Sequence, residues 1–195
     1  MGKCKALLIA LLLFSVSALS AEAQGSMNAN SSSASASTAQ QRTLFERLGG
    51  LPAITAFVDD AAARLAADTR INKKLANTNI PRLRLHLIEQ LCMVTGGPCE
   101  YTGQTMKKTH QHMQVTEGEW NATVEDLVAT MNHLNIGQQE QTDMLNILGS
   151  LKSQIVEVNS SATGTPLPSN FHPAPALPQS QIDAGPKMKK TRHGH

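Results

Sequence analysis

Aromatic side chains are scarce in this sequence, at 3% of its 195 residues. A β-sandwich or β-barrel of this length normally draws on more aromatic and β-branched residues, so the composition favours a helical body. Charged residues are also few, at 16%, and the formal net charge is +2. Charge therefore gives no indication of a nucleic-acid partner. The sequence also lacks a Gly-x-Ser-x-Gly motif, a phosphate-binding loop and a Cys-x-x-Cys-His motif.

Long hydrophobic runs are also rare, and the clearest one covers residues 6–19, after Lys3 and Lys5 and before Ala21-Glu22-Ala23. A positive start, an apolar middle and a small-x-small site are typical of a secretory signal peptide. A membrane-spanning helix needs roughly 20 apolar residues, so an uncleaved anchor is the weaker interpretation. We therefore expect residues 1–23 to be a signal peptide, the mature protein to be periplasmic or secreted, and no stable membrane insertion after cleavage.

The chain has three cysteines, and cleavage of the signal would remove Cys4. In an exported protein the remaining pair, Cys92 and Cys99, is expected to form a disulfide. The residues between them include Gly96-Gly97-Pro98, which favour a turn that would bring the sulfur atoms together. The alternative is a pair of unpaired thiols, one of them buried at the end of a helix.

Composition divides the mature chain into three parts. Residues 24–42 are rich in Ser and Ala and have almost no apolar bulk, so we expect a flexible linker. Residues 159–195 are rich in Pro and end in a basic cluster, and we expect a disordered tail. Residues 43–158 remain as the folded body.

The apolar spacing of this body is helical throughout, which predicts an all-α fold. Thr116 and Glu119 form the pattern of a capping box. Pro81 suits the first turn of a helix, whose apolar stripe contains Ile80, Leu83, Leu87, Leu91 and Val94. The expected helices are 44–48, 51–67, a short turn at 71–75, 81–94, a short helix from 106 to about 113, 117 to about 134, and 138–156.

The body contains four histidines, of which His110 is the best candidate for a metal ligand. On a helix Met106 and Met113 would lie about 40–60° to either side of it, whereas His112 would face elsewhere. A neutral imidazole among thioethers can bind iron. The alternative is a core histidine bonded to a backbone carbonyl. His86 lies at the edge of its helix's apolar stripe, where a histidine exposed to water is the ordinary interpretation.

Several motifs resemble those of one family when they are taken in order. Residues 43–50, Thr-Leu-Phe-Glu-Arg-Leu-Gly-Gly, resemble the opening of group I truncated haemoglobins. Gly96-Gly97-Pro98, Tyr101-Thr102-Gly103 and Met106-Lys107-Lys108-x-His110 resemble the family's loop into its proximal helix. The resemblance covers residues 43 to about 158. It implies a two-over-two helical sandwich around haem b, with His110 as the proximal iron ligand.

The resemblance also shows where this sequence departs from the family. Ala62 stands at the place of the common distal tyrosine, Leu87 at that of the distal glutamine, and Leu75 at that of an aromatic residue near the haem. Neither Ala62 nor Leu87 can donate a hydrogen bond to bound oxygen. His86 coincides with a distal-helix histidine that binds iron in some cyanobacterial members, so we expect it to coordinate iron or to donate to a bound diatomic gas.

The cofactor-binding residues expected from these arguments are His110, His86, Leu83, Leu87, Leu75 and Met106, with His110 and His86 as the metal ligands. The favoured function is reversible binding of oxygen or another diatomic gas, with nitric oxide dioxygenation as an activity to be tested. The second hypothesis is a bis-histidine haem protein for electron transfer or redox sensing, which would need a redox partner protein. The third is an exported helical protein that has lost its haem pocket.

Overall fold

The computed structural model describes residues 42–190 and is helical, with local sequence signals at most helix ends. Thr43 and Thr116 each form a capping box with the glutamate three residues later, as predicted for Thr116. Gly49 ends the first helix in the left-handed conformation, with φ of 105°. The helices are α2 (Leu44–Leu48), α3 (Gly50–Ala67), the 3-10 helix η1 (Asn72–Leu75), α4 (Ile80–Val94), α5 (Met106–His110), α6 (Glu117–His133), α7 (Gln138–Gly149), α8 (Lys152–Ile155) and α9 (Gln179–Ala184).

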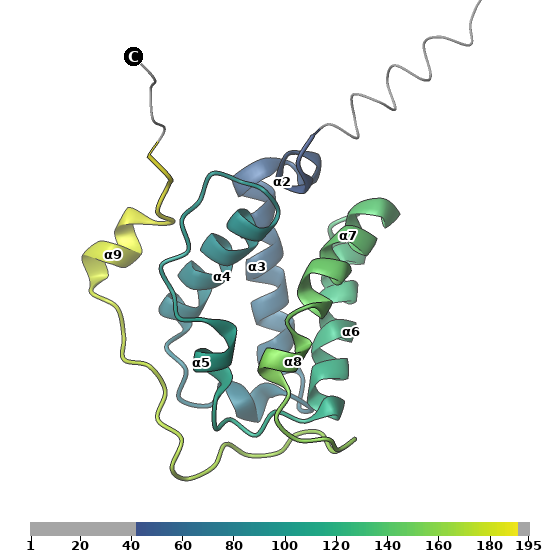
Figure 1. The fold of residues 1–195 in the computed structure, drawn as a ribbon, viewed down its shortest axis with the longest axis vertical. Helices are drawn as coiled ribbons and strands as arrows, with labels where there is room; N and C mark the ends of the chain where they lie inside the picture. Colours follow the sequence, from purple (N-terminus) through teal and green to yellow (C-terminus); the bar gives the residue numbers. More distant parts are fainter. Residues whose placement is uncertain (1–41, 191–195) are drawn as a thin grey trace, which may run out of the picture.

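Helix α3 is central, because it packs against both α4 and α6, and α6 packs in turn against α7 (Figure 1). The short α5 lies beside α8, and α2 contacts α3 and α7. The predicted stripe of α3 is buried at Ile54, Phe57, Val58 and Ala61. The core that joins these helices consists of Ile54, Phe57, Val58, Ala61, Ile88, Leu91, Met131 and Met144. The all-α sandwich expected from the sequence is thus confirmed.

Two helix predictions need correction. The expected final helix over 138–156 is two helices, since the chain leaves the α7 helix after Gly149 and begins α8 at Lys152. The helix that carries His110 ends at His110, so Met113 follows the helix instead of lying on it. Because His112 has φ of 69°, a conformation that no helix continues through, the helical positions assigned to His112 and Met113 do not apply.

The apolar stripe predicted for α4 does not all belong to the core. Leu85, Ile88 and Leu91 are buried, whereas Ile80 is 48% exposed. Leu83 and Leu87 line a cavity together with His86, and Leu87 also packs against the core. Periodicity finds apolar faces of a helix but does not distinguish a face that meets other helices from one that meets a cavity.

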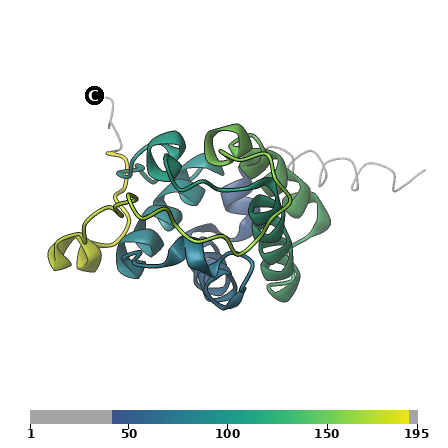
Figure 2. The same ribbon diagram turned by 90° about the horizontal axis from the view of Figure 1, so that it is seen from below.

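The segment after the body, residues 159–190, lies along the helices, contrary to the disordered tail expected from its composition. Figures 1 and 2 show it leaving α8, crossing the end of the bundle and continuing to α9 beside α4. Its amides and carbonyls bond to the body, as in Gly164 N to Arg70 O at 2.6 Å and Lys189 N to Pro98 O at 2.7 Å. A Cβ atom at Gly164, where φ is +63°, would lie 2.8 Å from the Thr69 carbonyl oxygen, so the contact requires glycine.

The predicted signal peptide at 1–23 and almost all of the predicted linker at 24–42 lie outside the described residues, as do residues 191–195. Within residues 42–190, no helix has both the length and the apolar character to cross a membrane.

Candidate functional site

A cavity of about 600 Å³ opens between α4 and α5, a volume typical of sites for small molecules and cofactors. One wall is the face of α4 that carries Leu83, His86, Leu87 and Gln90. Another part of the lining is α5 and the residues after it, including Met106 and His110. Leu75 of η1 and residues 170–175 of the C-terminal segment complete the lining. The six residues predicted to bind the cofactor therefore line one cavity, although their contact with a cofactor stays a prediction.

His110 is the last residue of α5, where Thr105 caps the helix start. Its Nδ1 lies 2.9 Å from the Met106 carbonyl oxygen, which can only accept, so Nδ1 carries the proton. Burial lowers the pKa of His110 below its ordinary value, an effect that the Met106 carbonyl and the charge of Glu157 only partly offset. The ring is thus a neutral imidazole whose Nε2 lone pair is available to a metal. The carbonyl contact, which was one alternative from sequence, is compatible with ligation.

His86 lines the cavity from α4 and is not a histidine in open water, since its side chain is only 13% exposed. Its Nδ1 is 3.1 Å from Oε2 of Glu89, one turn along α4. Its Nε2 is buried and has no hydrogen-bond partner within residues 42–190. A buried polar atom without a partner costs free energy, so a ligand at Nε2 of His86 would stabilise this site.

The Glu89 carboxylate beside His86 is itself buried, with 1% of the side chain exposed. Burial raises the pKa of Glu89, but hydrogen bonds from Thr102 and His86 outweigh this effect and hold the pKa below its usual value. Tyr101 packs its ring edge against His86, with the ring centroids 6.0 Å apart. Burial raises the pKa of Tyr101, and its hydroxyl donates to the Gln104 carbonyl at 2.6 Å.

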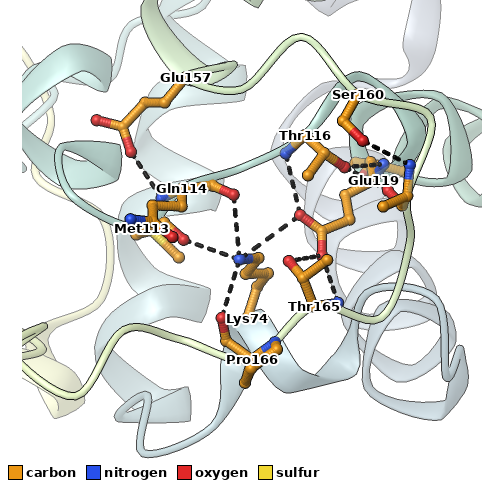
Figure 3. Close-up of polar contacts among 11 residues, drawn as sticks. Lys74, Met113, Gln114, Thr116, Glu119, Glu157, Ser160, Thr165 and Pro166 are labelled. Atoms are coloured by element: carbon orange, nitrogen blue, oxygen red, sulfur yellow. Dashed lines mark hydrogen bonds and ion pairs between the residues drawn. The ribbon is translucent and has the colours of Figure 1, made fainter.

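The loop that follows His110 is held by a buried lysine, Lys74 of η1, whose side chain is 5% exposed. Its ammonium donates to the carbonyl oxygens of Met113, Gln114 and Pro166 at 2.8, 3.2 and 3.3 Å, and lies 3.6 Å from the Glu119 carboxylate (Figure 3). Burial lowers the pKa of Lys74, and the charge of Glu119 partly offsets this effect. Lys74 thereby joins η1, the loop after His110 and the C-terminal segment.

Glu119 links the same elements through both of its carboxylate oxygens. Oε2 accepts the Thr116 amide of the capping box at 3.0 Å, and Oε1 accepts the amide and hydroxyl of Thr165 at 2.8 and 2.7 Å. Glu157 accepts the amides of His112 and Gln114 and so fixes the turn after His110. The side of the cavity that carries His110 is therefore built on polar contacts between segments distant in sequence.

Several residues of the cavity were not predicted from the sequence. Gln90 of α4 brings an amide to the wall, and Phe171 and His172 come from the C-terminal segment. Ala62, at the place of the family's distal tyrosine, is not among the lining residues, whereas Tyr101 is. The i, i+4 spacing of His86 and Gln90 could have indicated Gln90 from sequence. Composition offered no signal for Phe171, because Pro-rich segments usually do not pack.

Cys92 and Cys99 form the predicted disulfide, with Cα atoms 5.7 Å apart. Both cysteines are fully buried. Gly97 lies in the loop between them, and a Cβ atom there would be 2.7 Å from the Cys92 carbonyl oxygen and 2.6 Å from the Phe45 ring. The disulfide thus closes the tight turn that leads from α4 to Tyr101 and Thr102.

Comparison with known proteins places the described body in one family. The model of the bacterial-like globin family matches residues 43–157. The group 1 truncated haemoglobin of Tetrahymena thermophila is 33% identical over 100 residues, which cover 51% of this chain and 83% of that protein. The group 1 truncated haemoglobin GlbN of Nostoc commune is 28% identical over 114 residues, covering 58% and 97%.

Solved structures give the same result. The truncated haemoglobin of Tetrahymena pyriformis in its Fe(III) form superposes with a TM-score of 0.57 at 25% identity, covering 59% of this chain and 98% of that one. The 2/2 haemoglobin of Synechococcus, solved in the cyanomet state with covalently attached haem, gives a TM-score of 0.55 at 27% identity, covering 58% and 95%. From the family model, the relatives and the fold, this chain belongs to the bacterial-like globins and within them to the group 1 truncated haemoglobins, a family whose fold implies a haem cofactor.

Proposed function

We propose that this chain binds oxygen or another diatomic gas at the iron of haem b, with His110 as the proximal ligand and His86 on the distal side. The observation that carries the proposal is that two histidines from different helices, α4 and α5, line one cavity, each with Nδ1 at a protein oxygen. When bound, haem supplies an iron atom that coordinates diatomic gases and changes oxidation state. Haem b fits because the sequence has no Cys-x-x-Cys-His motif for covalent attachment.

The residues of the cavity fit a largely apolar macrocycle that holds a metal at its centre. Leu75, Leu83, Leu87 and Met106 offer apolar contacts. Within residues 42–190 no group of three or more His, Cys, Asp or Glu side chains is arranged to hold a metal ion. His110 and His86 would hold a metal whose remaining ligands come from the macrocycle itself.

We infer that His86 is a sixth iron ligand when no gas is bound. Its buried Nε2 has no hydrogen bond within the described chain, and a bond to a metal would satisfy it. A gas would then have to compete with His86, whose Nε2 carries a lone pair and cannot donate to the gas while Nδ1 holds the proton for Glu89. The Gln90 side chain also lines the cavity, and its amide can donate a hydrogen bond, which Ala62 and Leu87 cannot.

The same histidine pair supports a second candidate, electron transfer or redox sensing. With both histidines as ligands, the iron would need no new ligand when its oxidation state changes, and His86 already contacts Glu89 and Tyr101. This function would need a redox partner protein. Displacement of His86 by carbon monoxide separates the two candidates, since a gas-binding protein must allow that exchange readily.

Absorption spectra of the haem-loaded full chain test these assignments. We expect a low-spin ferric spectrum for the wild type, a high-spin spectrum for His86→Ala, and loss of tight haem binding for His110→Ala. His112→Ala is the matched control, because His112 lies at the same cavity but is exposed. A protein without a Soret band after reconstitution would refute haem binding. Normal haem content in His110→Ala would refute the proximal assignment, and a high-spin wild type would refute coordination by His86.

We also propose that the protein is exported to the periplasm or secreted. Support comes from the pattern of residues 1–23 and from the Cys92–Cys99 disulfide, since disulfides persist mainly in oxidising compartments. Fractionation of cells that express the full chain tests this proposal. A full-length precursor that stays in the cytoplasm would contradict it.

A further inference from the structure

The Glu89 carboxylate accepts hydrogen bonds from three residues, His86, Thr102 and Lys187. Oε2 lies 3.1 Å from His86 Nδ1, 3.0 Å from the Thr102 amide and 2.7 Å from the Thr102 hydroxyl. Oε1 accepts the Lys187 amide at 3.3 Å. A carboxylate with 1% exposure needs such donors, because an ionised group without them is very costly to bury. These hydrogen bonds fit an ionised Glu89, because an ionised carboxylate can only accept hydrogen bonds.

This hydrogen-bond pattern assigns the tautomer of His86. Because Oε2 accepts, Nδ1 of His86 must carry the proton, and the lone pair of the neutral ring lies on Nε2. Nε2 is the atom that is buried without a partner in the described chain. Glu89, His86 and the cavity thus form a carboxylate–histidine arrangement of the kind that orients metal-bound histidines.

We propose that Glu89 is a positioning residue for His86, which fixes the ring with Nε2 toward the iron and strengthens Nε2 as a ligand of ferric more than of ferrous iron. The inference rests on the proposed function, in which His86 binds the haem iron. A proton shared with a carboxylate leaves more electron density on the far ring nitrogen, and the more highly charged ferric iron gains more from it.

The two histidines differ in this respect. His110 donates to a neutral carbonyl, that of Met106, whereas His86 donates to a buried carboxylate. The distal ligand is therefore the more strongly polarised of the two, and Glu89 determines how tightly it holds the iron in each oxidation state. Thr102 weakens this effect, because its hydroxyl donates a hydrogen bond to the same oxygen, Oε2, that accepts from His86.

Two variants with opposite expected effects test the proposal in the haem-loaded full chain. Glu89→Gln keeps an acceptor of nearly the same shape but removes the charge. Loss of such a partner typically weakens a metal bond 10–100-fold. A tenfold loss of His86 affinity for the iron, confined to the ferric state, would raise the midpoint potential by about 59 mV. Thr102→Val removes the competing hydroxyl, so the midpoint potential should fall and the ferric low-spin fraction should stay at or above that of the wild type.

Glu100→Gln is the matched control. It removes an exposed carboxylate near the same loop, and this carboxylate bonds to Lys187 Nζ and not to His86. Its potential and spectrum should equal those of the wild type. A Glu89→Gln potential equal to that of Glu100→Gln, or a shift of the same sign in Glu89→Gln and Thr102→Val, would overturn the proposal. If Glu89→Gln fails to fold, the sign of the Thr102→Val shift decides.

The failure of this inference can be told from the failure of the proposed function. A wild type that is already high-spin and unchanged by His86→Ala would overturn both the distal ligation and the role of Glu89. A low-spin wild type that becomes high-spin in His86→Ala would uphold the ligation, and the Glu89→Gln potential would then test the role of Glu89 alone.

Discussion

Replacement of Phe171 by alanine should loosen haem from a protein whose body is otherwise unchanged. Phe171 is half-buried and lines the cavity from the C-terminal segment, where its amide donates to the Pro168 carbonyl at 2.9 Å. Full burial of a phenylalanine contributes about 1.5–3 kcal/mol. For a half-buried ring we take about 1–2 kcal/mol, which corresponds to roughly five- to thirtyfold faster haem dissociation.

Transfer of haem from the loaded chain to an excess of an apoglobin of high affinity measures this rate directly. Ile182→Ala is the control, because Ile182 belongs to the same C-terminal segment but lies on α9 and does not line the cavity. The free energy of unfolding of the haem-free variant should stay close to that of the wild type, since Phe171 is not part of the core of the body.

A dissociation rate of Phe171→Ala within twofold of the wild type would refute this reasoning. It would mean that the C-terminal segment does not cover the haem in solution. Equal acceleration by Phe171→Ala and Ile182→Ala would also count against it, because that result would indicate loosening of the whole segment instead of loss of one contact.

Three further predictions concern stability. Lys74→Met leaves a buried carboxylate without its cation, and the free energy of unfolding should fall by an amount near the lower end of about 3–5 kcal/mol, because the ionic distance of 3.6 Å is long. Replacing Cys92 and Cys99 by alanine should cost about 2–3 kcal/mol. Asp126→Asn should stabilise the protein at pH 7 by about 1 kcal/mol, because Oδ2 of Asp126 is buried and has no hydrogen-bond partner in the described chain. Urea unfolding measures all three.

Each of these predictions has its own control. Lys73→Met changes an exposed lysine beside Lys74 and should be nearly neutral. The double cysteine variant should match the reduced wild type, and a free-thiol count near two per denatured, unreduced mature chain would contradict the disulfide. Burial, and after it the charge of Asp68, raises the pKa of Asp126. The ionised form of Asp126 therefore opposes folding at neutral pH. This cost vanishes below pH 3.8, the pKa of Asp126 in the unfolded chain, where the group is protonated in both states. An Asp126→Asn gain that is the same at pH 7 and pH 3.5 would exclude this explanation.

Local signals in the sequence were sufficient for most of the helices and for part of the site. Capping boxes and turn glycines act over three or four residues, so Thr116 and Gly49 mark their helix ends without reference to the rest of the fold. The spacing of Met106 and His110 similarly places the Met106 carbonyl at the His110 ring, since residues four apart meet on one helical turn. The disulfide followed from two cysteines on either side of a short turn.

The remaining features depend on contacts between residues distant in sequence. Periodicity could not separate the side of α4 that meets the core at Ile88 from the side that meets the cavity at Leu83, because both are apolar. Composition made the C-terminal segment look unable to pack, since it has little apolar bulk. Its position is determined instead by hydrogen bonds to groups of the body, such as Lys74 to the Pro166 carbonyl.

The sequence by itself therefore determined the helical class, the family resemblance and the neighbourhood of His110, because these depend on short-range spacing. Only the tertiary structure decided the environment of His86. Its burial and its buried carboxylate neighbour depend on Thr102 and Lys187, which reach Glu89 from a loop 13 residues away and from a segment 98 residues away. No local pattern encodes such an arrangement, since each donor is brought to Glu89 by the packing of a different part of the chain.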